Sequence, residues 1–227
     1  MSDARGDAAG IGELDGPDGR GDLDDPDDLD DPDDFDDLER ILAYRGAADD
    51  RTGVDVIGPE LLVVPFWTPA FCQAIVRAAG LVGFTPDPDD PVPGHEVSLA
   101  AISPHLFESV QQDLGVRIWP QLQQVWPLID YHGVRDAFVI RYALGEQESL
   151  REHHDVAQVS ASVKLDTGHE GAELRFPRQG VDNSSVPVGS LLAWPSLVTH
   201  PHEATPLRRG VKHSLTIWFE LPFAPDL

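Results

Sequence analysis

Cysteine, basic residues and long apolar runs are all scarce in this chain of 227 residues. The single cysteine, Cys72, has no partner for an internal disulfide, which favours a reducing compartment such as the cytoplasm. No apolar run reaches the length of a membrane span, and the polar first residues lack the apolar core of a secretory signal. We therefore expect a cytoplasmic protein with no membrane partner.

Positive charge is scarce because 16 Lys and Arg stand against 40 Asp and Glu. Residues 1–39 hold 17 of the acidic residues and two arginines, so much of the excess lies at the N-terminus. A Leu-Asp-Asp-Pro-Asp-Asp hexapeptide begins there at Leu23 and repeats at Leu29. So few apolar side chains cannot build a core, and we expect residues 1–36 to be a disordered acidic tail. Such a tail acts as a solubilising extension or as a docking arm for a basic partner, and we expect no nucleic-acid partner.

The remaining residues, 37–227, are enough for one domain that begins with helices. A short helix is expected at 37–45 and a strand at 61–65. Thr68 is the predicted N-cap of a helix over Pro69–Ala79 that ends at Gly80. A longer helix is predicted to start near Ser103, because apolar side chains recur there at helical spacing. That stripe consists of Phe107, Val110, Leu114, Ile118 and Leu122.

From Phe138 onward the pattern changes to short β-rich runs separated by Gly, Pro and Asn turns. The runs cover residues 137–143, 158–166, 172–176, 187–194 and 211–220. Many short strands of this kind are typical of a sandwich or jelly roll. We expect an α+β fold that is mainly β, a double-stranded β-helix (jelly roll) with N-terminal helices packed on one sheet. Its open mouth would hold a site.

A candidate metal site begins with His153 and Asp155. Residues i and i+2 of an extended strand point to the same face, so this imidazole and this carboxylate should converge. About fifty residues later, His200 or His202 can supply a third ligand. Two histidines and one carboxylate are the ligands of a non-haem Fe(II) oxygenase. The same set also suits Zn²⁺ in a hydrolase, with water in the fourth position.

A cation and a hydroxyl follow His202: Lys212 lies ten residues after it and Ser214 twelve. Because side chains alternate along a strand, Lys212 and Ser214 should share the face opposite to that of Leu215 and Ile217. An ammonium and a hydroxyl that face a metal cavity are suited to hold the far carboxylate of a dicarboxylic acid.

Two segments resemble a known family. The segments FVIRYALGEQESLREHHD, residues 138–155, and VTHPHEATPLRRGVKHSLTIWF, residues 198–219, are similar to the catalytic domain of the procollagen lysyl hydroxylases. These belong to the prolyl and lysyl hydroxylase group of 2-oxoglutarate oxygenases. The match includes the double His with Asp and a Thr-His-x-His-Glu element followed by Pro206 and Gly210. It covers roughly residues 136–220.

The resemblance implies a role for each site residue. By its offsets, His153, Asp155 and His202 are the Fe(II) ligands, with His202 favoured over His200. Tyr142 and Lys212, assisted by Ser214, would bind 2-oxoglutarate. Lysyl hydroxylases carry Arg at the position of Lys212, whereas the collagen prolyl hydroxylases carry Lys there.

The implied activity is that of an Fe(II)- and 2-oxoglutarate-dependent dioxygenase, with O2 as cosubstrate and ascorbate as a possible requirement. Residues 37–227 would be its domain. The expected reaction is hydroxylation of an aliphatic C–H in a lysine or proline side chain of a peptide or protein, or in a free amino acid. Trp194 and Trp218 are candidates for a substrate platform. The alternatives are the zinc hydrolase and a non-catalytic interaction module that acts through the acidic tail.

Overall fold

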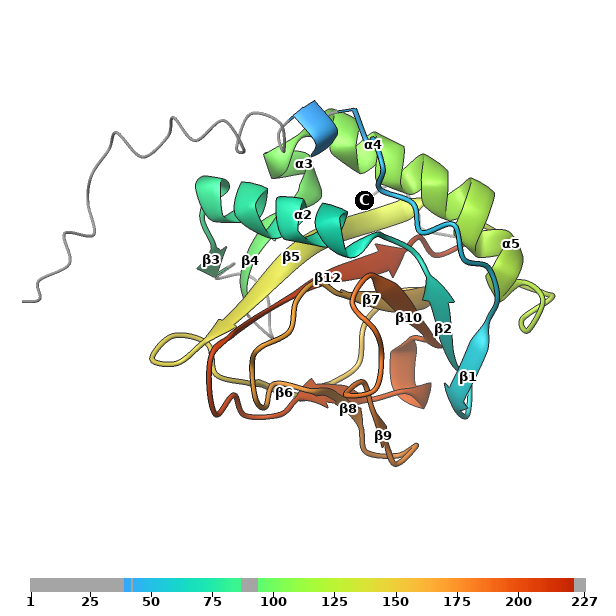
Figure 1. Ribbon diagram of the computed structural model, residues 1–227. Coiled ribbons are helices and arrows are strands. Elements are labelled where there is room, and N and C mark those ends of the chain that lie inside the picture. The colour runs from blue at the N-terminus through green and yellow to red at the C-terminus, as the bar shows by residue number, and fades with distance from the viewer. Residues whose placement is uncertain (1–38, 42, 87–93, 223–227) are drawn as a thin grey trace, which may run out of the picture.

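Two antiparallel sheets face each other, and helices cover the outer side of the larger one (Figure 1). This computed structural model describes residues 39–41, 43–86 and 94–222. The predicted acidic tail, residues 1–36, lies outside the described residues. Of the helix expected at 37–45, residues 39–41 are helical, and a turn follows at 43–46.

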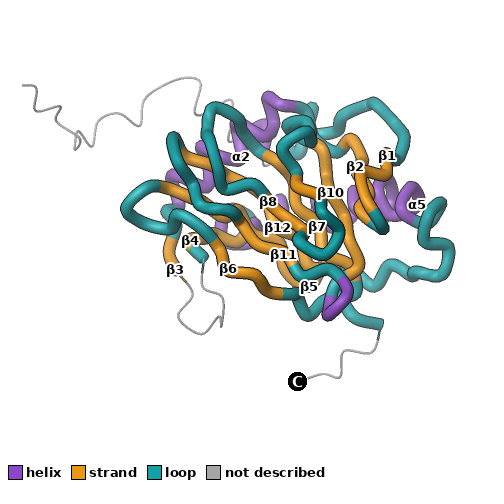
Figure 2. The backbone as a smooth tube through the Cα atoms, turned by 90° about the horizontal axis from the view of Figure 1, so that it is seen from below, coloured by secondary structure: helices purple, strands orange, loops and turns teal. Residues whose placement is uncertain are grey.

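The large sheet has eight strands and the small sheet has four. The order in the large sheet is β1 (Asp55–Gly58), β2 (Leu61–Pro65), β10 (Ser190–Pro195), β7 (Val159–Lys164), β12 (Val211–Phe219), β5 (Val134–Ala143), β4 (His95–Ser98) and β3 (Thr85–Pro86). The order in the small sheet is β6 (Leu150–His153), β11 (His202–Ala204), β8 (Leu174–Phe176) and β9 (Val181–Asp182). Figure 2 shows strands of the small sheet crossing over the large one. The mainly β, α+β architecture predicted from the sequence is confirmed at this level.

Alternation along β12 separates a helix-facing side of the large sheet from a side that faces the small sheet. Leu215, Ile217 and Phe219 are buried in the core beneath the helices. Lys212 and Ser214 lie on the opposite side, in the space between the two sheets. The period of two along a strand thus places apolar side chains in one layer and polar side chains in the other.

The first long helix, α2 (Pro69–Val82), begins where the sequence predicts and ends later. The Thr68 side chain accepts a hydrogen bond from the Phe71 N–H, and proline occupies the first turn. The predicted end at Gly80 is wrong. Gly80 is exposed and remains inside the helix, which ends at Gly83 with φ +91°. The N–H of Gly83 still donates to the Ala79 carbonyl, and this bond extends the helix past Gly80.

The second predicted helix is continuous but changes type along its length. It comprises α4 (Pro104–Asp113), a π-helical segment η2 (Leu114–Ile118) and α5 (Trp119–Leu122). It starts near Ser103 as predicted, and the Ser103 side chain caps it by accepting a hydrogen bond from the Leu106 N–H. The buried side chains of its inner face are Leu106, Val110, Leu114, Ile118 and Leu122. Phe107, which the spacing assigned to this face, is only partly buried at its edge. The one-turn helix α3 (Leu99–Ile102), which precedes it, was not predicted.

All five predicted β-rich runs form strands, as does the run at 61–65. None of these runs covers β1, β3, β4, β6, β9 or β11, although an extended strand was expected around His153 and Asp155. The segment 83–94, expected to be a loop, contains β3 at 85–86, and its residues 87–93 lie outside the described ranges. A single turn of 3₁₀ helix, η3 (Leu197–Thr199), precedes β11. Within the described ranges, no helix is long and apolar enough for a membrane crossing.

An apolar cluster closes the space between the two sheets at one end. Leu61 and Leu192 from the large sheet pack with Phe176 of the small sheet, and all three are almost fully buried. The Trp194 ring contacts the Phe176 ring edge-on, with centroids 5.1 Å apart. This cluster fixes the separation of the sheets, because close-packed interiors tolerate little change in volume. The rest of the space between the sheets remains open as a cavity.

Substitution of Gly189, which precedes β10, provides a test of the packing of the large sheet. A Cβ added at Gly189 would lie 1.9 Å from the Trp67 carbonyl oxygen, whereas a Cβ at Gly145 would meet nothing within 4 Å. Both glycines have φ +80°. Gly145→Ala should therefore lower the free energy of unfolding by about 1–2 kcal/mol, from backbone conformation alone. Gly189→Ala should lower it by at least about 2 kcal/mol more, because the backbone must shift. Urea denaturation measures both, and equal losses would contradict this packing.

Candidate metal centre and cosubstrate cavity

Strand pairing in the small sheet brings two distant histidines together. His153 ends β6 and His202 begins β11, and the two are directly paired in the antiparallel register. Side chains paired in this way lie on the same face of a sheet. Their ring centroids are 4.5 Å apart. Asp155 lies two residues past the end of β6, outside the extended strand that the sequence argument assumed, but its carboxylate still reaches the same point.

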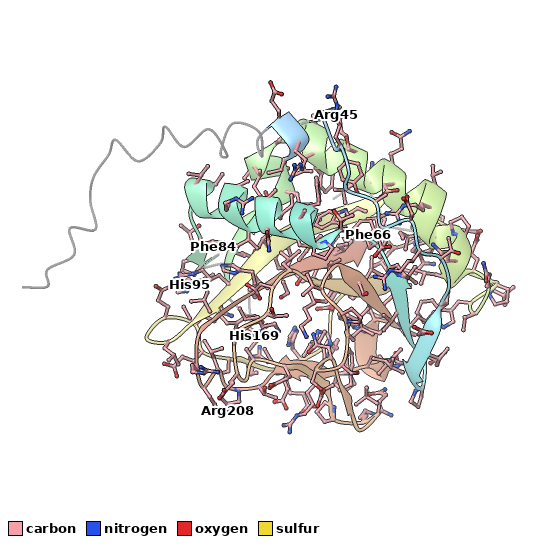
Figure 3. The ribbon with its side chains drawn as sticks, viewed as in Figure 1. Arg45, Phe66, Phe84, His95, His169 and Arg208 are labelled. Carbon is pink, nitrogen blue, oxygen red and sulfur yellow. The ribbon has the colours of Figure 1, made fainter. Side chains whose placement is uncertain are left out.

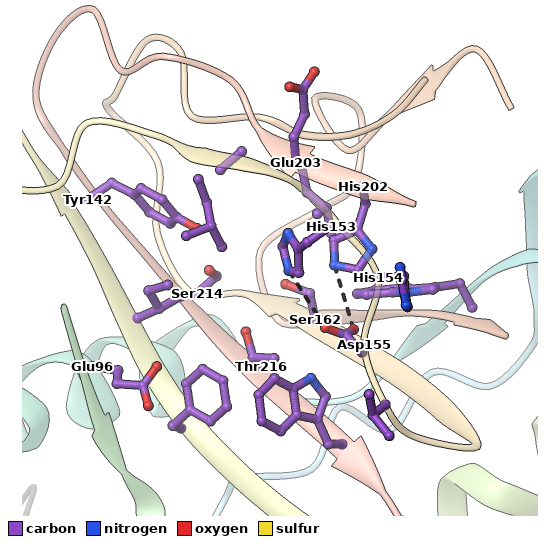
Figure 4. Close-up of a pocket in the computed structure, with 18 of the residues that line it drawn as sticks. Glu96, Tyr142, His153, His154, Asp155, Ser162, His202, Glu203, Ser214 and Thr216 are labelled. Atoms are coloured by element: carbon purple, nitrogen blue, oxygen red, sulfur yellow. Dashed lines mark ion pairs between the residues drawn. The ribbon is translucent and has the colours of Figure 1, made fainter. Parts of the chain in front are cut away.

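The three side chains form a compact donor cluster (Figure 4). His153, Asp155 and His202 offer ligand atoms that all lie within 4.8 Å of one another. The Nε2 atom of His153 lies 3.6 Å from Oδ1 of Asp155, and Nε2 of His202 lies 3.6 Å from Oδ2. These separations are too long for hydrogen bonds. Oδ2 is buried and has no hydrogen-bond partner among the described residues. Two imidazole nitrogens and an unpartnered carboxylate oxygen fit a divalent metal ion.

Backbone carbonyls orient both imidazoles. Nδ1 of His153 lies 2.8 Å from the Arg151 carbonyl oxygen, and Nδ1 of His202 lies 3.0 Å from that of His200. A carbonyl only accepts, so each Nδ1 carries the proton and each Nε2 presents its lone pair toward Asp155. Burial lowers the pKa of His202, which favours the neutral form that binds metals.

His200, the alternative third ligand, uses both of its ring nitrogens elsewhere. Nδ1 lies 3.0 Å from Oγ1 of Thr199, and Nε2 lies 3.1 Å from the Pro59 carbonyl oxygen. The structure therefore brings His202, and not His200, to Asp155. His154 lines the cavity but is not part of the donor cluster. Figure 3 shows His95 near β3 and His169 in the loop after β7, and neither lines the cavity.

The predicted cation and hydroxyl lie in the same cavity as the donor cluster. Lys212 is paired with Tyr142 across β12 and β5, and its Nζ lies 5.2 Å from the centroid of the Tyr142 ring. Nζ donates a hydrogen bond to the Ala172 carbonyl. Ser214, also buried, is next on the same face of β12. Burial lowers the pKa of Lys212 to about 8, and the negative charges of Asp166 and Glu173 counteract part of this effect.

The cavity has a volume of about 390 Å³. Besides the six predicted site residues, its lining includes three charged side chains to which sequence analysis gave no role, Glu96 on β4, Arg135 on β5 and Glu203 on β11. Burial raises the pKa of the Tyr142 hydroxyl, and the negative charge of Glu96 adds to this effect. Figure 4 shows Glu96 on the side of the cavity away from Asp155. No motif marks Glu96, since it lies about sixty residues before the donor cluster.

The effect of burial on Lys212 gives a testable pH dependence. The ordinary pKa of 10.5 falls to about 8 in the folded protein, so between these values the unfolded chain holds a proton that the folded chain has released. The free energy of unfolding of the wild type should therefore rise with pH relative to Lys212→Met, by about 3 kcal/mol between pH 7 and pH 11. Urea denaturation of the metal-free proteins measures the difference. A difference independent of pH would contradict the lowered pKa.

Comparisons with known proteins give distant relatives. No family model matches the chain. The multifunctional procollagen lysine hydroxylase and glycosyltransferase LH3 of Rattus norvegicus is 28% identical over 184 residues, which are 75% of this chain and 25% of that protein. Procollagen-lysine,2-oxoglutarate 5-dioxygenase 1 of Mus musculus is 27% identical over 167 residues, or 68% of this chain and 23% of that protein. The chain thus spans about a quarter of the length of these curated relatives.

Solved structures share the fold. The viral collagen prolyl hydroxylase vCPH from Paramecium Bursaria Chlorella virus-1, in its 2OG complex, has a TM-score of 0.55 and 18% identity, with 72% of this chain and 97% of that chain covered. An oxidoreductase of the 2OG-Fe(II) oxygenase family from Burkholderia pseudomallei has a TM-score of 0.51 and 13% identity, with 82% and 90% covered. Sequence and fold together identify the chain as a distant homologue of the procollagen lysyl hydroxylases with the architecture of the 2OG-Fe(II) oxygenases.

Proposed function

We propose that this protein is an Fe(II)- and 2-oxoglutarate-dependent dioxygenase that hydroxylates an aliphatic C–H. The substrate group is a lysine or proline side chain in a peptide or protein, or a free amino acid. One observation carries the proposal. Two Nε2 atoms and the unpartnered Oδ2 of Asp155 converge at one side of a cavity that also holds a buried ammonium, that of Lys212.

His153, Asp155 and His202 would hold the Fe(II) ion, which leaves its other positions open. With Fe(II) bound, 2-oxoglutarate and O2 would supply the oxidant: 2-oxoglutarate would lose CO2 to give succinate, which takes one oxygen atom, and the other oxygen atom would enter the substrate C–H as a hydroxyl group. The protein contributes orientation. The two backbone carbonyls that accept from the Nδ1 atoms keep the imidazoles in the tautomer that a metal requires.

Lys212 would bind the far carboxylate of 2-oxoglutarate. Its ammonium is buried and donates to the Ala172 carbonyl, which leaves other N–H donors for a carboxylate. The hydroxyl groups of Ser214 and Tyr142 lie on the same cavity wall and add hydrogen bonds. Charge-assisted hydrogen bonds in such a site are stronger than those between neutral groups.

The wider assignment extends the same proposal. The two facing sheets would form the double-stranded β-helix, with residues 37–227 as the catalytic domain and the acidic tail outside it. The names of the relatives point to lysine or proline residues as substrates. By the resemblance, Lys212 occupies the position at which the collagen prolyl hydroxylases also carry a lysine that binds 2-oxoglutarate.

An anaerobic titration of the metal-free protein with Fe(II) and 2-oxoglutarate tests the proposal. The visible charge-transfer band of the bound pair should form in the wild type and in His154→Ala, whose imidazole is outside the donor cluster. It should be lost in Asp155→Ala. Lys212→Ala should weaken the affinity for 2-oxoglutarate about 10- to 100-fold, because a hydrogen bond to a charged group is lost. A folded wild type that binds Fe(II) but gives no band would overturn the assignment.

A further inference from the structure

A second cation lies at the other end of the cavity from Lys212. Among the described residues that line the cavity, Lys212 and Arg135 are the two with lysine or arginine side chains. Along β12, Lys212, Ser214, Thr216 and Trp218 all face the cavity. Arg135 stacks on the last of these, Trp218.

The two cations are too far apart to bind the same carboxylate of 2-oxoglutarate. Six residues separate Lys212 from Trp218, which corresponds to about 20 Å along an extended strand. A carboxylate that is bound at Lys212 therefore cannot also reach Arg135 at the far end of β12. Arg135 is therefore available for a different ligand.

The Arg135 guanidinium is held in place by two contacts. Its carbon lies 4.8 Å from the centroid of the Trp218 ring, and one terminal nitrogen donates to the Val156 carbonyl. Val156 directly follows Asp155, so this contact ties the guanidinium to the segment that carries the carboxylate of the donor cluster. The Trp218 ring is itself supported by an edge-on contact with Phe138, at 5.0 Å between centroids. A guanidinium fixed in this way loses little side-chain entropy when it binds a ligand.

Arg135 also differs from neighbouring arginines in its lack of an ion pair. Four others on this part of the chain have a carboxylate within 4.0 Å: Arg141 with Glu146, Arg175 with Glu203, Arg208 with Glu173 and Arg209 with Glu170. No carboxylate of the described residues lies that close to Arg135. The charge of Arg135 acts on the neighbouring Asp136 only at longer range.

An unpartnered donor lies next to this guanidinium. The indole N–H of Trp218 is buried and has no acceptor among the described residues. A buried donor without an acceptor is unfavourable unless a ligand supplies one. One terminal nitrogen of Arg135 donates to Val156, and this contact does not use Nε or the other terminal nitrogen. A carboxylate can accept two parallel hydrogen bonds from these two nitrogens.

We propose that Arg135 binds a carboxylate of the substrate. The substrate is then an amino acid with a free carboxylate, either as the free molecule or as the C-terminal residue of a peptide. The inference rests on the proposed hydroxylase function and narrows its substrate class. It makes Arg135 a specificity-determining residue, beside the metal and separate from the 2-oxoglutarate site.

Binding measured without turnover tests the inference. The protein is loaded anaerobically with Mn(II) and 2-oxoglutarate and titrated calorimetrically with L-lysine and L-proline, with their carboxamides, and with short peptides ending in either residue as acid or amide. At least one acid should bind, at least 10-fold more tightly than its amide. Arg135→Gln should abolish that preference and leave the affinity for 2-oxoglutarate unchanged. Comparison of free amino acids with C-terminal peptides identifies the source of the carboxylate.

Arg178→Gln is the matched control. Arg178 is also exposed and also donates to a loop carbonyl, that of Val198, but it does not line the cavity. This variant should keep the preference for acids. The inference is overturned if no acid binds, if acids and amides bind alike, or if Arg135→Gln keeps the preference. If 2-oxoglutarate itself fails to bind in the loading step, the proposed function fails, and this inference with it.

Discussion

The buried Asp155 carboxylate, held between two imidazoles, is the constraint on which the rest of the site depends. A buried charge without partners is strongly unfavourable, and neither Nε2 atom is close enough to hydrogen-bond to it. A divalent cation at this point would satisfy all three groups at once. The geometry in turn depends on the pairing of β6 with β11, because a register slip of one residue would turn His202 to the other face.

The two sides of the large sheet differ in what they contact: one side packs in the main core and the other lines the cavity. On the helix side of the large sheet, apolar side chains form the main core, which holds the strands rigidly. On the other side, the same strands present Lys212, Ser214 and Tyr142 to the cavity. Because adjacent residues of β12 belong to different layers, residues that stabilise the sheet also set the direction of those that line the cavity. The lowered pKa of Lys212 reflects the desolvation that accompanies this placement.

Local patterns in the sequence predicted much of this arrangement. Period-two alternation predicted that Lys212 and Ser214 share a face, and both line the cavity. The spacing of His153 and Asp155 predicted their convergence, whereas the choice of His202 over His200 depended on resemblance. The structure supplies a physical reason for that choice, since both nitrogens of His200 already have partners.

Features that arise from tertiary contacts were not predictable in the same way. Arg135 and Glu96 enter the cavity because β5 lies beside β12 and β4 lies beside β5 in the sheet, and no local spacing marks either residue. The end of α2 was misplaced because an exposed glycine within a helix is tolerated at a cost of about 1 kcal/mol, so Gly80 alone does not end it. The π-helical segment between α4 and α5 likewise has no signal in the apolar periodicity.

We propose that the donor cluster and Lys212 form the two ends of one cosubstrate site. The most direct measurement is a crystal structure of the protein loaded anaerobically with Fe(II) and 2-oxoglutarate. We expect an iron anomalous peak at bonding distance from His153, Asp155 and His202, with the far carboxylate of 2-oxoglutarate against the Lys212 ammonium. Iron bound elsewhere, or 2-oxoglutarate bound away from Lys212, would contradict it.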